Sequence, residues 1–261
     1  MSGTDTRVSV SLRGHAGLIV MHDEAHHNAL ASVHVRALLD ALEQTRRLQA
    51  RVVVIASDAK SFCAGADIGE MLRGGWLLGK APADADTPLA LFRTLLEDPR
   101  PVIAAVDGLA LGGGVELVLS SDIALATPRA RFAMPELGLG VLPRTALVRL
   151  PEIVGRRNAM ELILTRRRFA AEEALGMGLV NRIVDADALI ETALEMANGI
   201  AACPPAALAA AKRNLGRTPP DDWEGFDALL RQMDPQEWQE GFAAFLAKRS
   251  PDYAPMWEKR R

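Results

Sequence analysis

The chain has 261 residues, of which 49% are hydrophobic and 24% charged, and its formal net charge is −3. This length suits one large domain or a domain with a small appendage, and the lack of a basic excess argues against nucleic acid as a partner. Two cysteines, Cys63 and Cys203, are too few for a secreted disulfide scaffold. The sequence shows neither a signal-peptide pattern nor an unbroken apolar membrane span. We therefore expect a cytoplasmic protein.

The first half of the chain alternates β-rich runs with amphipathic segments. Two runs on either side of Gly14–Gly17 predict a β-hairpin. Helical spacing of apolar residues predicts a helix that Ser32 caps and that continues to about Gln49. The apolar run Arg51–Ser57 is typical of a strand covered on both faces. The further elements expected here are a loop at 58–67, a short helix at Ile68–Leu72, a surface segment at 73–88, a helix at Leu89–Glu97 and a buried strand at Pro101–Val106.

The second half begins with a glycine-rich turn, from which a predicted helix runs over Gly113–Leu119. Strands are expected at 122–126 and within 178–184, and the pattern beyond is mostly helical. Because strands and helices alternate with short connections, the sequence predicts an α/β core over residues 1–195. A helical C-terminal region over residues 196–261 would follow it.

The run Gly112–Gly114 at the start of a helix has two interpretations. It is a tight turn for close backbone packing, or it exposes the unpaired amides of a helix N-terminus to a ligand oxygen. The run fits neither the dinucleotide-binding pattern G-x-G-x-x-G nor a P-loop. Gly65, in "SFCAGADI" after a central strand, allows a second unusual turn. Two amides from two such turns could converge on one oxygen, which is what an oxyanion hole requires.

The motifs around these glycines resemble those of the enoyl-CoA hydratase/isomerase (crotonase) superfamily. The similar segments, in chain order, are "HNAL", "SFCAGADIGEM", "PVIAAVDGLALGGGVELVLSSDIALA", "FAMPELGLG", "GLVNRIV" and "EGFAAFLAKRSPDY". The resemblance covers nearly the whole chain. It implies an α/β, crotonase-like spiral of ββα units with a helical C-terminal region that helps form homotrimers, often paired into hexamers. It also implies an acyl-CoA thioester substrate, with coenzyme A as part of that substrate and no separate cofactor.

The resemblance also assigns roles to individual residues by motif. It implies that the amides of Ala64 and Gly113 form the oxyanion hole and that Glu116 and Glu136 are the two catalytic acids of a hydratase. The CoA-binding residues that it implies are Ala66, Asp67 and Ile68, which match the lining of the adenine pocket, and Lys248, which matches a lysine that reaches a CoA phosphate, often across a subunit contact.

Hydration of an α,β-unsaturated thioester needs such groups on chemical grounds as well. Negative charge develops on the thioester oxygen, and two N–H donors stabilise it. Water loses a proton as it adds to Cβ while Cα gains one, and two carboxyls of different protonation state can do both. Glu116 or Glu136 alone could be an ordinary acid at a helix start. Both acids together with both turns predict an enoyl-CoA hydratase.

Some features depart from the family pattern or suggest other chemistry. Arg144 stands where the family has a glycine, and the stretch from Pro143 to Pro151 is one residue shorter. An isomerase or another specialised crotonase is therefore an alternative, and a non-catalytic acyl-CoA-binding protein is a third. The segment "HDEAHH" lacks the H-E-x-x-H spacing of zinc enzymes, so we expect no metal site. Cys63 could be a nucleophile in principle, but a packing role is the preferred interpretation.

Overall fold

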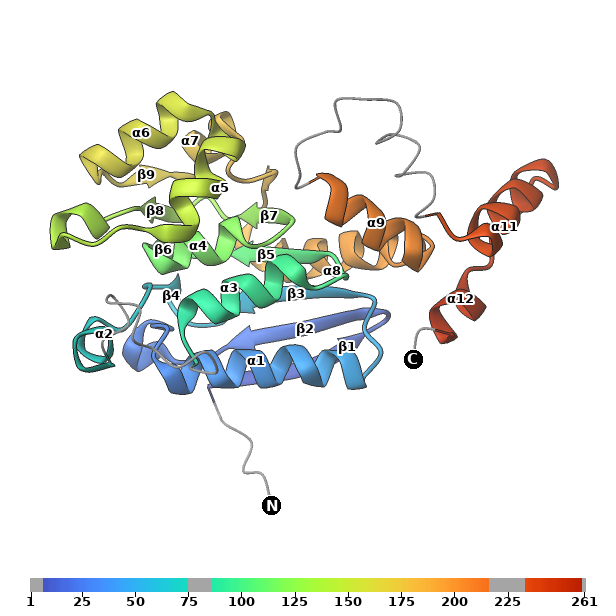
Figure 1. Cartoon of the computed structure of the whole chain (residues 1–261), viewed down its shortest axis with the longest axis horizontal. Coiled ribbons are helices and arrows are strands. Elements are labelled where there is room, and N and C mark those ends of the chain that lie inside the picture. The colour runs from blue at the N-terminus through green and yellow to red at the C-terminus, as the bar shows by residue number, and fades with distance from the viewer. Residues whose placement is uncertain (1–6, 75–85, 216–232, 260–261) are drawn as a thin grey trace, which may run out of the picture.

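The structure, a computed structural model, describes residues 7–74, 86–215 and 233–259. Two sheets form its centre, and a helical region extends from one end (Figure 1). The six-stranded sheet has the order β1-β2-β3-β5-β7-β10. Its strands are β1 (Val8–Arg13), β2 (Ala16–Met21), β3 (Val52–Ser57), β5 (Val102–Val106), β7 (Ile123–Ala126) and β10 (Arg182–Ile183). The predicted hairpin is confirmed, because β1 pairs antiparallel with β2, whereas the other neighbours in this sheet pair in parallel.

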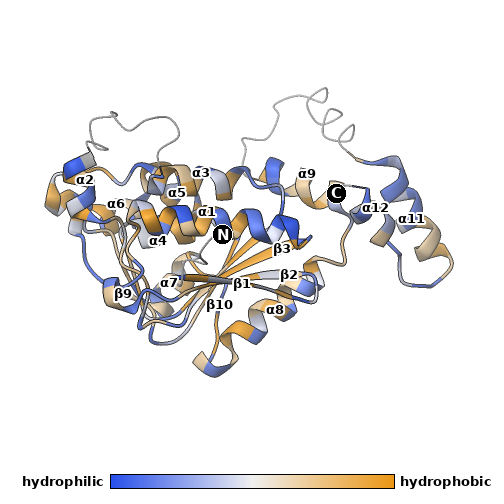
Figure 2. Ribbon diagram, turned by 90° about the horizontal axis from the view of Figure 1, so that it is seen from below, coloured by the Kyte–Doolittle hydropathy of each residue, from blue (hydrophilic) through white to orange (hydrophobic). Residues whose placement is uncertain are grey.

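Both faces of the six-stranded sheet are covered. Helices α1 (Ser32–Arg47) and α3 (Pro88–Glu97) lie on one face, and α8 (Leu189–Ile200) lies on the other (Figure 2). Alternate residues of β3 enter the two cores: Val53 and Ile55 join the side with α1 and α3, while Val52 and Val54 join the side with α8. Every residue of β3 is buried, which confirms the prediction of a strand covered on both faces.

A second sheet was not predicted from the sequence. It has the order β4-β6-β8-β9, and its strands are β4 (Ser61–Cys63), β6 (Leu109–Leu111), β8 (Arg131–Ala133) and β9 (Phe169–Ala170). Two of these strands lie in segments that the sequence predicts to be a loop and a glycine turn. Each strand has only two or three residues, and its pairing partner lies far away in the chain.

The predicted helices are confirmed over the described residues, with one error at a helix start. The further helices are α2 (Ile68–Gly74), α4 (Gly113–Leu119), α5 (Arg144–Val154), α6 (Arg156–Thr165), α7 (Ala171–Met177), α9 (Pro205–Leu215), α11 (Pro235–Leu246) and α12 (Ala254–Glu258), with 3-10 turns η1 (Glu24–His26), η3 (Glu136–Leu139) and η4 (Ala186–Ala188). Ser32 does not cap α1. Its N–H and hydroxyl both donate to the carboxylate of Glu70, on α2, so an acid from another helix serves the start of α1.

The C-terminal helices α9, α11 and α12 lie at the end of the molecule opposite to α2 (Figure 1). Helix α11 carries an exposed apolar face whose members are Trp238, Phe242, Phe245 and Leu246. No helix among the described residues has the length and apolar character needed to cross a membrane. Most of the predicted surface segment at 73–88 falls on residues 75–85, outside the described residues.

Candidate active site

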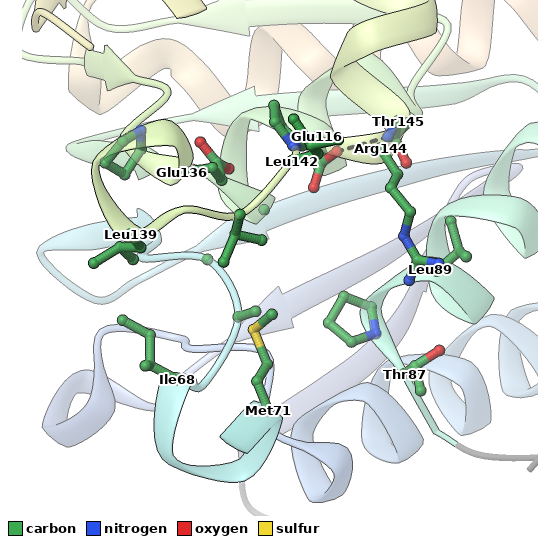
Figure 3. Close-up of a pocket in the computed structure, with 18 of the residues that line it drawn as sticks. Ile68, Met71, Thr87, Leu89, Glu116, Glu136, Leu139, Leu142, Arg144 and Thr145 are labelled. Carbon is green, nitrogen blue, oxygen red and sulfur yellow. Dashed lines mark hydrogen bonds between the residues drawn. The ribbon is translucent and has the colours of Figure 1, made fainter. Parts of the chain in front are cut away.

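A cavity of about 310 Å³ lies where α2, α3 and α4 meet the segment that joins β8 to α5 (Figure 3). Most of its wall is apolar: the side chains of Ile68, Met71, Leu72, Leu89, Phe92, Leu139 and Leu142 line it. Glu116 and Glu136 belong to the same wall, together with the backbone of both glycine turns. The cavity therefore brings together the two acids and the two turns that the sequence singled out.

The glycines before α4 permit close approaches at this wall. A Cβ atom on Gly114 would lie 2.1 Å from the carbonyl oxygen of Cys63, so only glycine lets α4 approach β4 this closely. Gly112 has φ +52°, and a Cβ atom there would lie 2.8 Å from Oε1 of Glu136. The close-packing interpretation of the glycine run is thereby confirmed, and the absence of a side chain on Gly112 leaves room at the cavity wall for the carboxyl group of Glu136.

Two backbone amides lie close together at the glycine turns. A Cβ atom on Gly65 would lie 3.0 Å from the nitrogen of Gly113, and one on Gly113 would lie 3.2 Å from the nitrogen of Ala66. Neither the Gly113 nor the Ala66 N–H donates to another described residue. Both residues line the cavity. Two neighbouring N–H donors are therefore without a partner among the described residues, as an oxyanion hole requires.

The structure corrects one of the two predicted donors. The N–H of Ala64 donates to the carbonyl of His27 over 2.9 Å, so it is engaged within the protein. Two residues further on, the N–H of Ala66 occupies the position beside Gly113. The sequence could not separate the two alanines, because both flank Gly65 and only the hydrogen bond to the distant residue 27 distinguishes them.

Glu116 lies on the first turn of α4 and is held by a different helix. Its Oε1 accepts hydrogen bonds from the N–H groups of Thr145 and Ala146, over 2.8 and 3.0 Å. These amides belong to the first turn of α5, which has no side-chain cap of its own. Burial raises the pKa of Glu116 above its ordinary value, while the two amides and the positive charge of Arg144 oppose that shift by stabilising the carboxylate. No local sequence pattern predicts this anchoring, because it joins residues that are 29 and 30 positions apart.

Glu136, at the start of η3, has different surroundings. Its Oε2 is buried and has no hydrogen-bond partner among the described residues. Burial raises the pKa of Glu136 to about 7, and the neighbouring charge of Glu116 adds to the increase. Figure 3 shows both carboxyl groups at the same wall of the cavity. One acid is anchored by two amides and the other is not, so the pair can hold a carboxylate and a neutral carboxyl side by side.

The predicted CoA-binding residues are only partly assembled within one chain. Ala66 and Ile68 line the cavity. Asp67 has a structural role as well, because its carboxylate accepts from the N–H of Glu70 in the first turn of α2. Lys248 follows α11, at the opposite end of the molecule from α2. The described chain therefore does not bring Lys248 to the cavity.

Cys63 lies beneath this site, at the end of β4, and is fully buried. Burial raises the pKa of its thiol to about 12. A thiol in this state is not a nucleophile at neutral pH. The packing interpretation of Cys63 accounts for its position against α4.

The chain is similar to known proteins over most of its length. A family model described as enoyl-CoA hydratase/isomerase matches residues 14–256. A probable enoyl-CoA hydratase of Rhizobium meliloti strain 1021 is 39% identical over 253 residues, which cover 94% of this chain and 96% of that protein. A methylmalonyl-CoA decarboxylase of Escherichia coli K12 is 33% identical over 237 residues, 87% of this chain and 89% of that protein.

A solved structure of an enoyl-CoA hydratase/isomerase from Cupriavidus metallidurans CH34 is similar with a TM-score of 0.82 and 34% identity, covering 97% of this chain and 98% of that one. The predicted crotonase-like α/β fold is thereby confirmed, as is the family resemblance.

Proposed function

The chain belongs to the enoyl-CoA hydratase/isomerase family, and from that premise we propose that it is an enoyl-CoA hydratase. It would add water across the α,β double bond of a trans-2-enoyl-CoA and release the 3-hydroxyacyl-CoA. The observation that carries this proposal is the pair of differently held acids, Glu116 and Glu136, in one cavity with two unpaired amides.

The amides of Ala66 and Gly113 would bind the thioester oxygen. As water adds to Cβ, negative charge moves onto this oxygen, and preorganised N–H donors stabilise that charge without reorganising. Each such donor typically contributes about 3 kcal/mol to the transition state. The support for this step is the proximity of the two amides and their lack of partners among the described residues.

Glu116 would act as the general base and Glu136 as the proton donor. The amides of Thr145 and Ala146 occupy one oxygen of Glu116 and favour its ionised form, which leaves the other oxygen for the attacking water. Because its pKa is raised, Glu136 holds a proton near neutral pH and can deliver it to Cα. Hydroxide is added to Cβ and a proton to Cα, and exchange with solvent restores both carboxyls.

Hydration of crotonyl-CoA, measured by loss of the enoyl absorbance, tests this assignment. Glu116→Gln and Glu136→Gln should each lower kcat by roughly 100- to 10,000-fold, the usual contribution of general acid–base catalysis. A glutamine at position 116 can still accept from both amides, so α5 keeps its anchor. Glu172→Gln, at an exposed position of α7, is the matched control and should have no effect. Unchanged turnover in either site variant contradicts the proposal.

A double-bond isomerase, or another crotonase reaction, is the alternative within the family. It is favoured by Glu136, because one carboxyl without a fixed partner could move a proton between two carbons. Mass analysis of products separates the reactions: hydration adds one water, isomerisation adds nothing, and decarboxylation removes carbon dioxide. A non-catalytic acyl-CoA-binding protein would bind enoyl-CoA esters and return them unchanged.

We also propose that the C-terminal region, residues 196–261, mediates trimer formation and that Lys248 contacts a CoA phosphate bound to a neighbouring copy. The exposed apolar face of α11 supports the first point, and the distance of Lys248 from its own cavity supports the second. Light scattering after size-exclusion chromatography should give a trimer or hexamer, and Phe245→Asp should shift it to a monomer. A monomeric native chain would refute the assembly.

A further inference from the structure

Arg144 is the one cation among the described residues that line the cavity. The other ionisable groups of this lining are Glu116 and Glu136, and the rest of the lining is mostly apolar. Figure 3 shows the Arg144 side chain running from the start of α5 toward α3, along the cavity and away from the two carboxyls. A single positive charge thus lies at a mostly apolar cavity, on a side chain that points away from the two carboxyls.

The guanidinium of Arg144 has no hydrogen bond or ion pair with a described residue. Many arginines of this protein are paired instead: Arg36 with Asp86, Arg129 with Asp107, and Arg249 with Glu240. The charge of Arg144 stabilises the carboxylate of Glu116, but no ion pair joins the two. Its five N–H donors remain available for a planar anion, which they can bind in a bidentate manner.

An arginine at this position does not stabilise the helix that it begins. Arg144 is the first residue of α5, where the helix dipole disfavours a positive charge. The usual explanation of an unpaired arginine is simple solvation at the surface, and this side chain is indeed exposed. Arg144 differs from a simply solvated arginine in that it lines the cavity, where its guanidinium can contact a bound ligand.

We propose that Arg144 selects substrates whose acyl chain ends in a carboxylate, that is, 2-enedioyl-CoA thioesters. This inference rests on the proposed function only for the position of the reacting carbons, between Glu116 and Glu136. From there the apolar wall would accommodate the methylene groups, and the guanidinium would bind the carboxylate at the far end of the chain. A CoA ester also carries phosphate groups, which are the other anions that this guanidinium could bind. A pair of esters that differ only at the end of the acyl chain distinguishes a terminal carboxylate from a CoA phosphate.

Binding of two saturated esters tests the proposal without any turnover. Adipoyl-CoA and hexanoyl-CoA share coenzyme A and six acyl carbons, and they differ in a terminal carboxylate against a methyl group. Calorimetric titration of the native protein should give the lower Kd for adipoyl-CoA. Arg144→Met should weaken adipoyl-CoA roughly 10- to 100-fold more than hexanoyl-CoA, the range expected for a hydrogen bond to a charged group. Arg144→Lys should retain part of the preference.

Arg156→Met, at an exposed arginine on α6 outside the cavity, is the matched control and should leave both affinities unchanged. Equal weakening of both esters by Arg144→Met would assign Arg144 to a CoA phosphate and overturn the proposal, as would a native preference for hexanoyl-CoA. Thermal melting confirms that the variants are folded. Because binding is measured apart from hydration, a lack of turnover on crotonyl-CoA would refute the hydratase assignment while leaving this result interpretable.

Discussion

Replacing Glu136 by glutamine should stabilise the protein at pH 8 but not at pH 4.5. The pKa of Glu136 is raised from 4.5 to about 7. Between these two pH values, the folded state therefore keeps a proton on Glu136 that the unfolded chain has already released. Stability therefore decreases as pH rises through this window and stays reduced above it. Glutamine has no proton to lose, and the variant escapes this decrease.

The full shift corresponds to roughly 3 kcal/mol, at 1.36 kcal/mol per pKa unit. Because Glu136 lines an open cavity, solvent screens part of this energy, and we expect a gain of about 1.5–3 kcal/mol at pH 8. Urea unfolding of the native protein and Glu136→Gln at both pH values, at one fixed protomer concentration, measures the difference. Effects of the substitution that do not depend on pH cancel between the two conditions. An equal stability difference at pH 4.5 and pH 8 would show that Glu136 titrates normally, and the argument for a neutral proton donor would fail.

Two further substitutions test how the cavity wall is built. Gly114→Ala should destabilise the protein by about 1–3 kcal/mol in thermal or urea unfolding, because the new methyl group meets the backbone carbonyl of Cys63 at 2.1 Å. Gly176→Ala, within α7, is its control: nothing lies within 4 Å of the added carbon, so this variant should be as stable as the native protein or slightly more so. Equal melting temperatures for the two variants would contradict the close approach of α4 to β4. Glu70→Ala removes the acceptor of both Ser32 hydrogen bonds and should cost about 1–2 kcal/mol, the usual value of a lost helix cap. It should also raise KM more than it lowers kcat, since α2 forms part of the cavity wall; a change in kcat alone would speak against this.

Elements that depend on local pattern were predictable from the sequence. The apolar run of β3 and the helical spacing of α1 are visible within one window of residues, and both elements begin and end within about two residues of their expected bounds. The candidate acids Glu116 and Glu136 were identified through the family resemblance, because they stand in motifs that extend over many residues.

Features that depend on contacts between distant residues were not predictable. The strands of the second sheet are too short to give a period, and they exist because their partners supply hydrogen bonds across the fold. Ser32 has the side chain of an N-cap, yet an acid from another helix takes that role. Ala64 and Ala66 look alike in the sequence, and the carbonyl of His27 decides which amide is engaged. In each case the deciding contact is with a residue far away in the chain.

The bond between Glu116 and the start of α5 has a practical consequence for anyone who redesigns this scaffold. Exchanging the carboxylate for an alkyl group would do more than abolish a base, because it would also leave two main-chain donors at the start of α5 without their acceptor. A new chemistry at this position therefore requires a substitute acceptor in the same place, such as a side-chain amide, before any other residue is altered.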